Sequence, residues 1–241
     1  MSEKFWVLES PRVRLAKWDT GNVWKKRDSP ISELDSGRDE YTGFGGPSNR
    51  LLDLRVVLKS REVQDFVWTI PDCLIRSRVL DMFHEQNFTG FQVRHVRARL
   101  DTSLKSGDSA DEAVPGAHVQ GLWELVVTGW GGVATPESGV TRIPNTNIWQ
   151  GCPDWSKIVD IDAWDGSDFF IVWPFGFVRL VSDRVATFIK EQKLAGVKLV
   201  SPEACTRWYK QSKLNQATPM RLRDHLPDER AREIGEPLGI Y

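Results

Sequence analysis

The sequence predicts an α+β fold in which one strand–helix–strand unit occurs twice. Two stretches far apart in the chain share a residue pattern at constant spacing, and each pattern is typical of a strand, a helix, a glycine and a second strand. Two further helix starts lie near the carboxyl terminus. At 241 residues the chain can form one large domain. We therefore expect a single domain over residues 1–241, with a mixed sheet, two similar units and C-terminal helices.

The repeat carries the clearest signal in the chain. The sequence RVLDMFHEQNFTGFQV of residues 78–93 returns as RVATFIKEQKLAGVKL at residues 184–199, an offset of 106 residues. Arg, Val, Glu, Gln and Gly are identical in the two copies. The expected pseudo-repeated halves are about 51–100 and 158–200. A repeat of this kind specifies architecture and leaves the chemistry open.

Upstream of the repeat, residues 1–50 are predicted to be rich in loops. Residues 5–8 (FWVL) form a plausible opening strand, but residues 28–49 are rich in Ser, Gly, Asp and Pro and have no sustained apolar period. Loops of that length in a compact domain are usually functional or disordered. Residues 52–58 alternate in the manner of a half-buried strand.

Within the repeat, residues 66–75 are strand-like and Ser77 is placed to cap the helix that follows. The apolar helix face is given by i, i+3 and i+4 spacing in both copies: Val79, Met82 and Phe83, then Val185, Phe188 and Ile189. Gly90 and Gly196 follow the helices, where glycine most easily makes a left-handed turn. A strand pattern resumes over residues 91–100.

The rest of the chain adds one strand and two helices. Residues 100–116 are polar, and they are either a mobile excursion or the seam between two halves. Residues 122–128 are a strongly apolar strand. A serine–proline start at residues 201–202 predicts a helix to about Lys213. A second helix is predicted from Pro227, with Gly235 as its stop and Pro237 beyond it.

Composition excludes several classes of partner. The chain has 32 basic and 33 acidic residues and a formal net charge of −1, so nothing favours nucleic acid or an anionic membrane electrostatically. Three scattered cysteines form no disulfide framework and no CxxC pair. The amino terminus lacks a signal-peptide pattern and no segment reaches roughly 18 apolar residues. We predict a cytoplasmic protein.

Eleven tryptophans are present, and core packing is the simplest role for most of them. Four lie among polar and turn residues and are better candidates for the surface: Trp18, Trp24, Trp149 and Trp155. Large aromatic side chains at a surface often anchor a protein partner.

The densest polar motif is WDGSDFFIVWP at residues 164–174. Asp165 and Asp168, three residues apart beside Ser167, could act as acid and base or bind a metal. A turn before an apolar strand is the favoured interpretation, because Asp-Gly and Ser bond neighbouring amides. The four histidines are isolated and no phosphate loop or zinc spacing is present. No catalytic residue, cofactor or metal is therefore predicted.

The run from Trp164 to Gly196 resembles the C-terminal half of a myxobacterial paralogous family named for a double CxxCG motif and associated with immunity to swarming-inhibitory toxins. The tail over residues 222–241 and the WELVVTGWGG segment at residues 123–132 share the likeness, which covers the chain from about Leu51 to its end. Neither CxxCG pair is present here. The resemblance implies that a zinc clip has been lost, so no metal is expected.

The resemblance implies a non-catalytic immunity protein that binds and neutralises a cognate intercellular toxin. The alternatives are an accessory or regulatory protein-binding module of a myxobacterial pathway, and a hydrolase using Asp165 and Asp168. The residues peculiar to this chain that we predict to contact the partner are Trp18, Trp24, Asp35, Asp39, Glu40 and Tyr41. An acidic, aromatic loop would suit a basic toxin surface. The sequence does not predict an oligomeric state.

Overall fold

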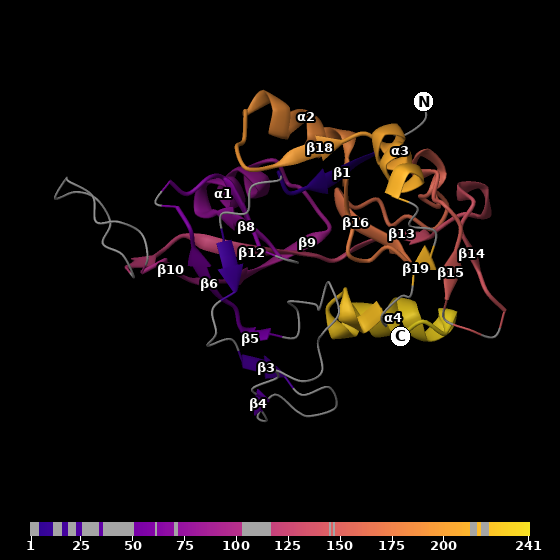
Figure 1. Cartoon of the computed structure of the whole chain (residues 1–241), viewed down its shortest axis with the longest axis horizontal. Helices are drawn as coiled ribbons and strands as arrows, with labels where there is room; N and C mark the ends of the chain where they lie inside the picture. Colours follow the sequence, from indigo (N-terminus) through magenta and orange to yellow (C-terminus); the bar gives the residue numbers. More distant parts are fainter. Residues whose placement is uncertain are drawn as a thin grey trace.

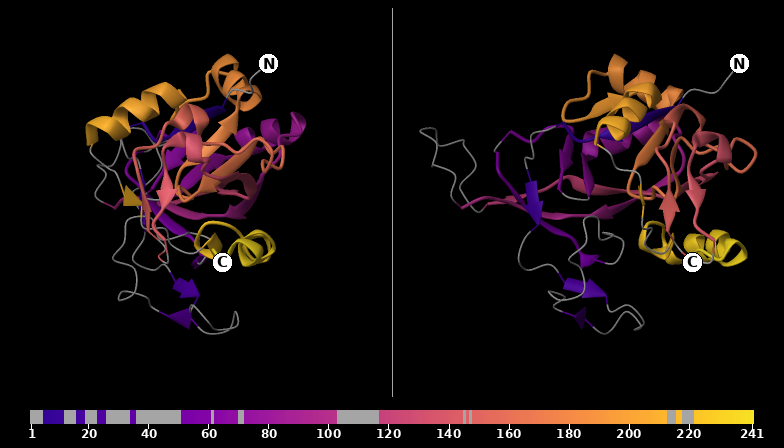
Figure 2. Two further views of the ribbon diagram at one scale, coloured as in Figure 1. Left: turned by 90° about the vertical axis from the view of Figure 1, so that its right-hand side faces the viewer. Right: turned by 45° about the vertical axis from the view of Figure 1, so that its right-hand side comes forward.

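The computed structural model describes residues 5–11, 16–18, 23–25, 34–35, 51–60, 62–69, 72–102, 117–144, 146, 148–212, 216–217 and 222–241. Mixed sheets and four α-helices make up this part of the chain, which confirms the predicted α+β class. Figure 1 shows α2 and α3 on the opposite side of the molecule from α4, and the views in Figure 2 agree. Within the described residues, none of the helices has the length and apolar character needed to cross a bilayer.

Two sheets carry the repeat. The five-stranded sheet has the order β13-β16-β17-β1-β18, and the four-stranded sheet has the order β7-β8-β12-β9. The strands of the first sheet are Gly129–Val133 (β13), Phe169–Trp173 (β16), Arg179–Ser182 (β17), Phe5–Glu9 (β1) and Lys198–Val200 (β18). Those of the second are Phe66–Trp68 (β7), Cys73–Arg76 (β8), Leu122–Val127 (β12) and Phe91–His95 (β9).

The described residues form three further sheets, one of four strands and two of three. One has the order β11-β10-β6-β2, another β14-β15-β19 and the third β4-β3-β5. Their strands are, in chain order, Ala16–Trp18 (β2), Val23–Lys25 (β3), Leu34–Asp35 (β4), Leu51–Asp53 (β5), Arg55–Leu58 (β6), Arg97–Leu100 (β10), His118–Val119 (β11), Thr141–Arg142 (β14), Trp149–Gln150 (β15) and Gln216–Ala217 (β19).

The helices are Ser77–Glu85 (α1), Asp183–Glu191 (α2), Pro202–Ser212 (α3) and Asp228–Leu238 (α4), with short 3-10 turns at Pro136–Ser138 (η2), Trp155–Lys157 (η3) and Leu222–Asp224 (η4). A large apolar core gathers the inner faces of α1, α2 and α3 against the two main sheets. A smaller core lies between β6 and β10 on one side and the opposite face of β7, β8 and β12 on the other.

The structure reproduces the repeat residue by residue. Helices α1 and α2 both have nine residues and begin 106 residues apart. Asn87 and Lys193, also 106 apart, both have φ of 51°, which is rare for a residue with a side chain. Gly90 and Gly196 follow with φ of 80° and 84°. The two copies therefore share their backbone through the helix and the turn after it.

Each copy is a hairpin, a helix and a strand, and an antiparallel strand from elsewhere in the chain lies between the parallel strands. The first unit comprises β7, β8, α1 and β9 with β12 inserted. The second comprises β16, β17, α2 and β18 with β1 inserted. Glu124 pairs with Leu74 and Arg94, and Val7 pairs with Leu180 and Val200, so the partners again differ by 106.

The inserted strand occupies a different position in the chain order in each unit. In the first unit β12 follows the repeat, whereas in the second β1 precedes it by most of the chain. The indoles of the two strands make equivalent hydrogen bonds. Trp6 Nε1 donates to Asp183 at 2.8 Å and Trp123 Nε1 donates to Ser77 at 3.0 Å, onto the first residue of α2 and of α1. The second unit is thus a circularly permuted counterpart of the first.

Several local predictions are wrong. Within residues 66–75, β7 and β8 are two antiparallel strands in place of one, and Thr69 and Asp72 bond each other between them. Ser77 does not cap α1, because its hydroxyl accepts from the Trp123 indole; Arg76 holds the cap position without a side-chain bond. Ser182 does cap α2 through Val185 N.

The last helix and two tryptophans also differ from expectation. Helix α4 continues through Gly235 and Pro237 and ends at Gly239, whose φ of 63° is left-handed. Gly235 instead lies where a Cβ would be 2.9 Å from Tyr241 Cα, so its small size admits the folded-back tail. Trp149 and Trp155 are buried, because β15 and η3 turn them inward despite their polar neighbours.

Candidate functional site

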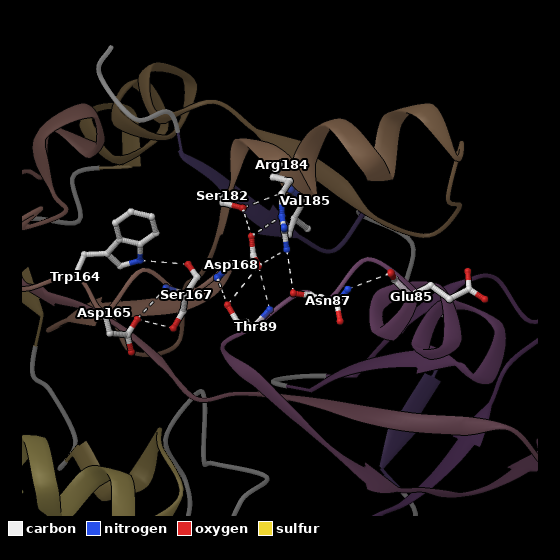
Figure 3. A network of polar contacts seen from close by, with 10 residues as sticks. All are labelled: Glu85, Asn87, Thr89, Trp164, Asp165, Ser167, Asp168, Ser182, Arg184 and Val185. Carbon is white, nitrogen blue, oxygen red and sulfur yellow. Dashed lines mark hydrogen bonds and ion pairs between the residues drawn. The ribbon is translucent and has the colours of Figure 1, made fainter.

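Asp168 stands at the start of β16 and is buried, with 8% of its surface exposed. Its Oδ2 accepts from Thr89 N at 3.0 Å and its Oδ1 accepts from Ser182 Oγ at 2.8 Å. Arg184, on the first turn of α2, donates to both oxygens, at 3.3 Å through Nε and 2.8 Å through Nη2. Figure 3 shows these side chains converging between the two units. Both carboxylate oxygens are already used by the protein.

Asp65 makes the equivalent arginine and backbone-amide contacts in the other unit, without a hydroxyl in the place of Ser182. It is 3% exposed and precedes β7, as Asp168 precedes β16. Its Oδ1 accepts from Arg78 Nε at 2.7 Å, and its Oδ2 accepts from Ala195 N at 2.9 Å. Arg78 and Arg184 differ by 106 residues, as do Thr89 and Ala195. Asp65 is therefore the structural counterpart of Asp168.

The two aspartates join the units reciprocally. Asp168 of the second unit accepts from the amide of the turn after α1, and Asp65 of the first accepts from the turn after α2. Backbone bonds run alongside: Phe169 N donates to Thr89 O and Phe66 N to Ala195 O, both at 3.0 Å. We call these two sets of contacts the inter-unit clamps. In each clamp the aspartate is paired with an arginine of its own unit, 16 or 13 positions away, and its bond from a backbone amide links elements 79 or 130 positions apart.

The glycines of the repeat are required by the clamps. A Cβ on Gly90 would lie 2.1 Å from Phe169 O, and one on Gly196 would lie 2.1 Å from Phe66 O. Only glycine combines that close approach with a positive φ. The identical glycine in the two sequence copies thus marks the place where each unit contacts the other.

Asp165 has a different role, which the contacts of Asp65 do not repeat. Its Oδ1 accepts from Ser167 N at 3.1 Å and from the Ser167 hydroxyl, as the predicted turn requires. Its Oδ2 accepts from Trp130 N at 3.0 Å and from Arg230 Nη2 at 2.8 Å. Asp165 therefore ties the turn to β13 and to α4. The carboxylate oxygens of Asp165 and Asp168 thus all accept hydrogen bonds from within the protein, and the motif holds elements together.

Burial also shifts the pKa of described groups outside this motif. Burial raises the pKa of the Cys73 and Cys205 thiols to about 12, which keeps both protonated and weak as nucleophiles. Burial, with Arg179 nearby, lowers the pKa of His225 to about 4. In the described part of the chain, no three His, Cys, Asp or Glu side chains gather in a way that could hold a metal ion.

The predicted partner-binding residues lie at the edge of what the structure describes. Trp18 is on β2, opposite Val56 of β6. Trp24 of β3 and Asp35 of β4 are cross-strand partners, so the backbone register brings this aromatic and this acidic residue together. Asp39, Glu40 and Tyr41 lie outside the described residues. Their role as a contact surface stays a prediction.

Sequence reasoning missed Asp65. The signal was available, because Asp65-Phe66 aligns with Asp168-Phe169 at an offset of 103, three less than that of the helices. The difference arises from a second hairpin that is three residues longer than the first, 13 against 10 positions from Phe169 to Ser182 and from Phe66 to Arg76. A search at one constant offset cannot find it.

No protein-family model matches the chain, and a search among curated proteins gives no significant match. The class that the fold and the site define is thus a duplicated α+β scaffold whose densest polar cluster holds its two halves together. Function is inferred from the chain's own residues and from the resemblance described above.

Proposed function

We propose that this chain is a non-catalytic immunity protein that binds and neutralises a cognate protein toxin in the cytoplasm. The observation that supports the proposal is the set of hydrogen bonds that Asp168 makes within the protein. This carboxylate, one of the two that the sequence offered as acid and base, accepts from Thr89, Ser182 and Arg184 and has a counterpart in Asp65. A group duplicated for structural reasons is a poor candidate for a reaction centre.

The resemblance agrees with that assignment. Its most recognisable stretch, residues 164–196, contains β16, β17 and α2, which are part of the second unit of the scaffold. A scaffold shared among paralogs leaves partner choice to the surfaces around it. A binding protein needs such a rigid frame and requires no reacting group.

The test is protection in cells. The chain is co-expressed with each protein encoded beside its gene, and growth and complex formation are measured. Protection together with a stable complex is the expected result. A complex without protection would favour an accessory binding module, and neither with any neighbouring product would overturn the proposal.

A double variant separates neutralisation from hydrolysis. Asp165→Asn, Asp168→Asn should lower stability, and protection should persist in proportion to the folded protein that remains. Loss of protection in a double variant that is still fully folded at the growth temperature would instead assign these carboxylates a chemical role.

A further inference from the structure

Strand β1 lies between β17 and β18 and completes the hydrogen bonding of the second sheet. Its backbone pairs antiparallel with both neighbours, so that Val7 stands opposite Leu180 on one side and Val200 on the other. Figure 1 shows β1 and β18 side by side below α2. Without β1, the facing edges of β17 and β18 would present backbone amides and carbonyls that need a partner.

Apolar contacts bury most of the β1 side chains. Phe5, Val7 and Leu8 belong to the large apolar core. The Phe5 ring packs edge-on against Phe170 of β16 and against Trp164, with 5.1 and 5.2 Å between the ring centroids. The stabilisation from apolar burial depends on what a side chain contacts, and the route by which the chain reaches that place does not enter.

The two remaining β1 side chains make polar contacts with α2 and β18. The Trp6 indole donates to Asp183, and Lys190 Nζ lies 3.7 Å from the centroid of its ring. Glu9 forms an ion pair with Lys198 at 3.9 Å. These partners all lie within residues 164–200. We call them, together with the facing edges of β17 and β18, the β1 slot.

The chain connects β1 to a different part of the molecule from the one that it packs in. Residues 10–15 lead from β1 to β2, which pairs with β6 in another sheet. Ala16 of β2 and Val56 of β6 belong to the smaller core, whereas Val7 belongs to the large one. Strand β1 is therefore joined to one body of the protein by the chain and to another by its contacts.

The first unit indicates that such a slot does not require one particular connection. Strand β12 takes the place of β1 there, because its pairing partners Leu74 and Arg94 are each 106 residues before Leu180 and Val200. It arrives from β11, after the repeat, whereas β1 arrives from before it. Equivalent slots thus receive strands that come from opposite directions along the chain.

The inter-unit clamps are made without β1. Asp168 and Asp65 accept from the amides of Thr89 and Ala195 and from arginines at the starts of α2 and α1. These contacts join the two units whichever copy of β1 occupies the slot. The slot can therefore be regarded as a binding site for an extended apolar strand on an assembled scaffold.

We propose that the β1 slot accepts β1 from a second copy of this chain, so that two copies exchange this strand and form a dimer. An exchanged β1 makes the contacts that it makes within one chain, and the cost is mainly the freedom that two associating chains lose. The exchanged fraction rises with protein concentration for the same reason. Exchange of β1 is independent of the immunity role.

The experiment uses two full-length variants, both in a Cys152→Ser background. One carries Glu9→Cys and the other Lys198→Cys, since these two residues are directly opposite in the register of β1 and β18. The two chains are unfolded, mixed, refolded at high concentration and oxidised. Disulfide-linked dimer is then measured by non-reducing electrophoresis. Exchange brings the two thiols together across the chains.

A matched mixture provides the control. Glu137→Cys with Lys198→Cys again pairs an exposed glutamate position with Lys198, but Glu137 lies on η2 and outside the slot. The Glu9→Cys mixture should give roughly tenfold more linked dimer, because the slot holds its two thiols at a high effective concentration. One chain that carries both Glu9→Cys and Lys198→Cys, refolded at low concentration, should form the disulfide within itself.

A competing peptide tests the slot directly. A peptide of residues 1–11 present during refolding should lower the yield of linked dimer about threefold or more when in excess, as expected for competition at one site. The same peptide with Val7→Asp should not, because Val7 is buried in the slot. Linked dimer at the level of the control mixture, while the single chain forms its internal disulfide, would overturn the exchange. A yield that the unaltered peptide leaves unchanged would also overturn it.

Discussion

The two units of this chain fold in the same way and end differently. They share helices of equal length, left-handed turns at Asn87 and Lys193, and a clamp made by Asp65 in one and Asp168 in the other. The second alone adds Asp165, a longer hairpin and α3. What is common to both units serves folding, so features found in only one are where a specific function should be sought.

The largest expected effect comes from the glycines at the clamps. Gly90→Ala and Gly196→Ala each place a Cβ 2.1 Å from a backbone carbonyl, which cannot move without breaking the clamp. Overpacking and a positive φ together should lower the free energy of unfolding by about 3–5 kcal/mol. Urea unfolding followed by fluorescence measures it.

Gly166→Ala is the control for these substitutions. Its φ is 78° but a Cβ there would meet no atom within 4 Å, so only the backbone strain of about 1–2 kcal/mol applies. Equal losses at Gly90, Gly196 and Gly166 would show that the close approach between the units has no energetic weight.

Stability should depend on pH through His225, which packs on the second hairpin and not on the first. His225 covers Gly176 in the second hairpin, packs on Trp173 and has a pKa lowered from 6.5 to about 4 by burial, with Arg179 adding to it. His225 therefore binds a proton less readily in the folded protein than in the unfolded chain. Stability is full above pH 6.5 and falls as pH drops toward 4, by on the order of 3 kcal/mol for the whole shift.

The variant His225→Asn tests this pH dependence. It should be less stable at pH 7 and should flatten the dependence between pH 6.5 and 4, measured by urea unfolding at each pH. If stability falls with pH as steeply in the variant as in the wild type, groups other than His225 cause the pH dependence.

The smallest difference concerns the helix starts. Ser182 accepts from Val185 N and donates to Asp168, whereas Ser77 accepts from an indole and caps nothing. Ser182→Ala should cost about 1 kcal/mol or somewhat more, and Ser77→Ala less, about 0.5 kcal/mol. Thermal unfolding of the two variants side by side compares them, and a larger loss at Ser77 would be the contradictory result.

Local sequence patterns predicted the repeat and much of the strand content. The helix faces at Val79 and Phe83 and the glycines at 90 and 196 follow from periodicity and turn chemistry. The position of β1 between β17 and β18 could not be predicted in this way, because no local pattern indicates which strands are its neighbours. The burial of Trp155 was likewise hidden, since it depends on Thr206, 51 positions along the chain. Asp65 was missed because its offset from Asp168 is 103, whereas that of the helices is 106.

The clamps themselves provide the most direct test of the account. We predict that Asp65→Asn and Asp168→Asn each lower the free energy of unfolding by about 2–3 kcal/mol. Each substitution weakens the ion pair with an arginine and the hydrogen bond that the aspartate accepts from a backbone amide. Similar losses in the two variants are the predicted result. Removing a reacting group usually leaves stability unchanged or raises it. A loss at Asp65 with no loss at Asp168 would therefore contradict the equivalence of the two units and return Asp168 to the candidates for chemistry.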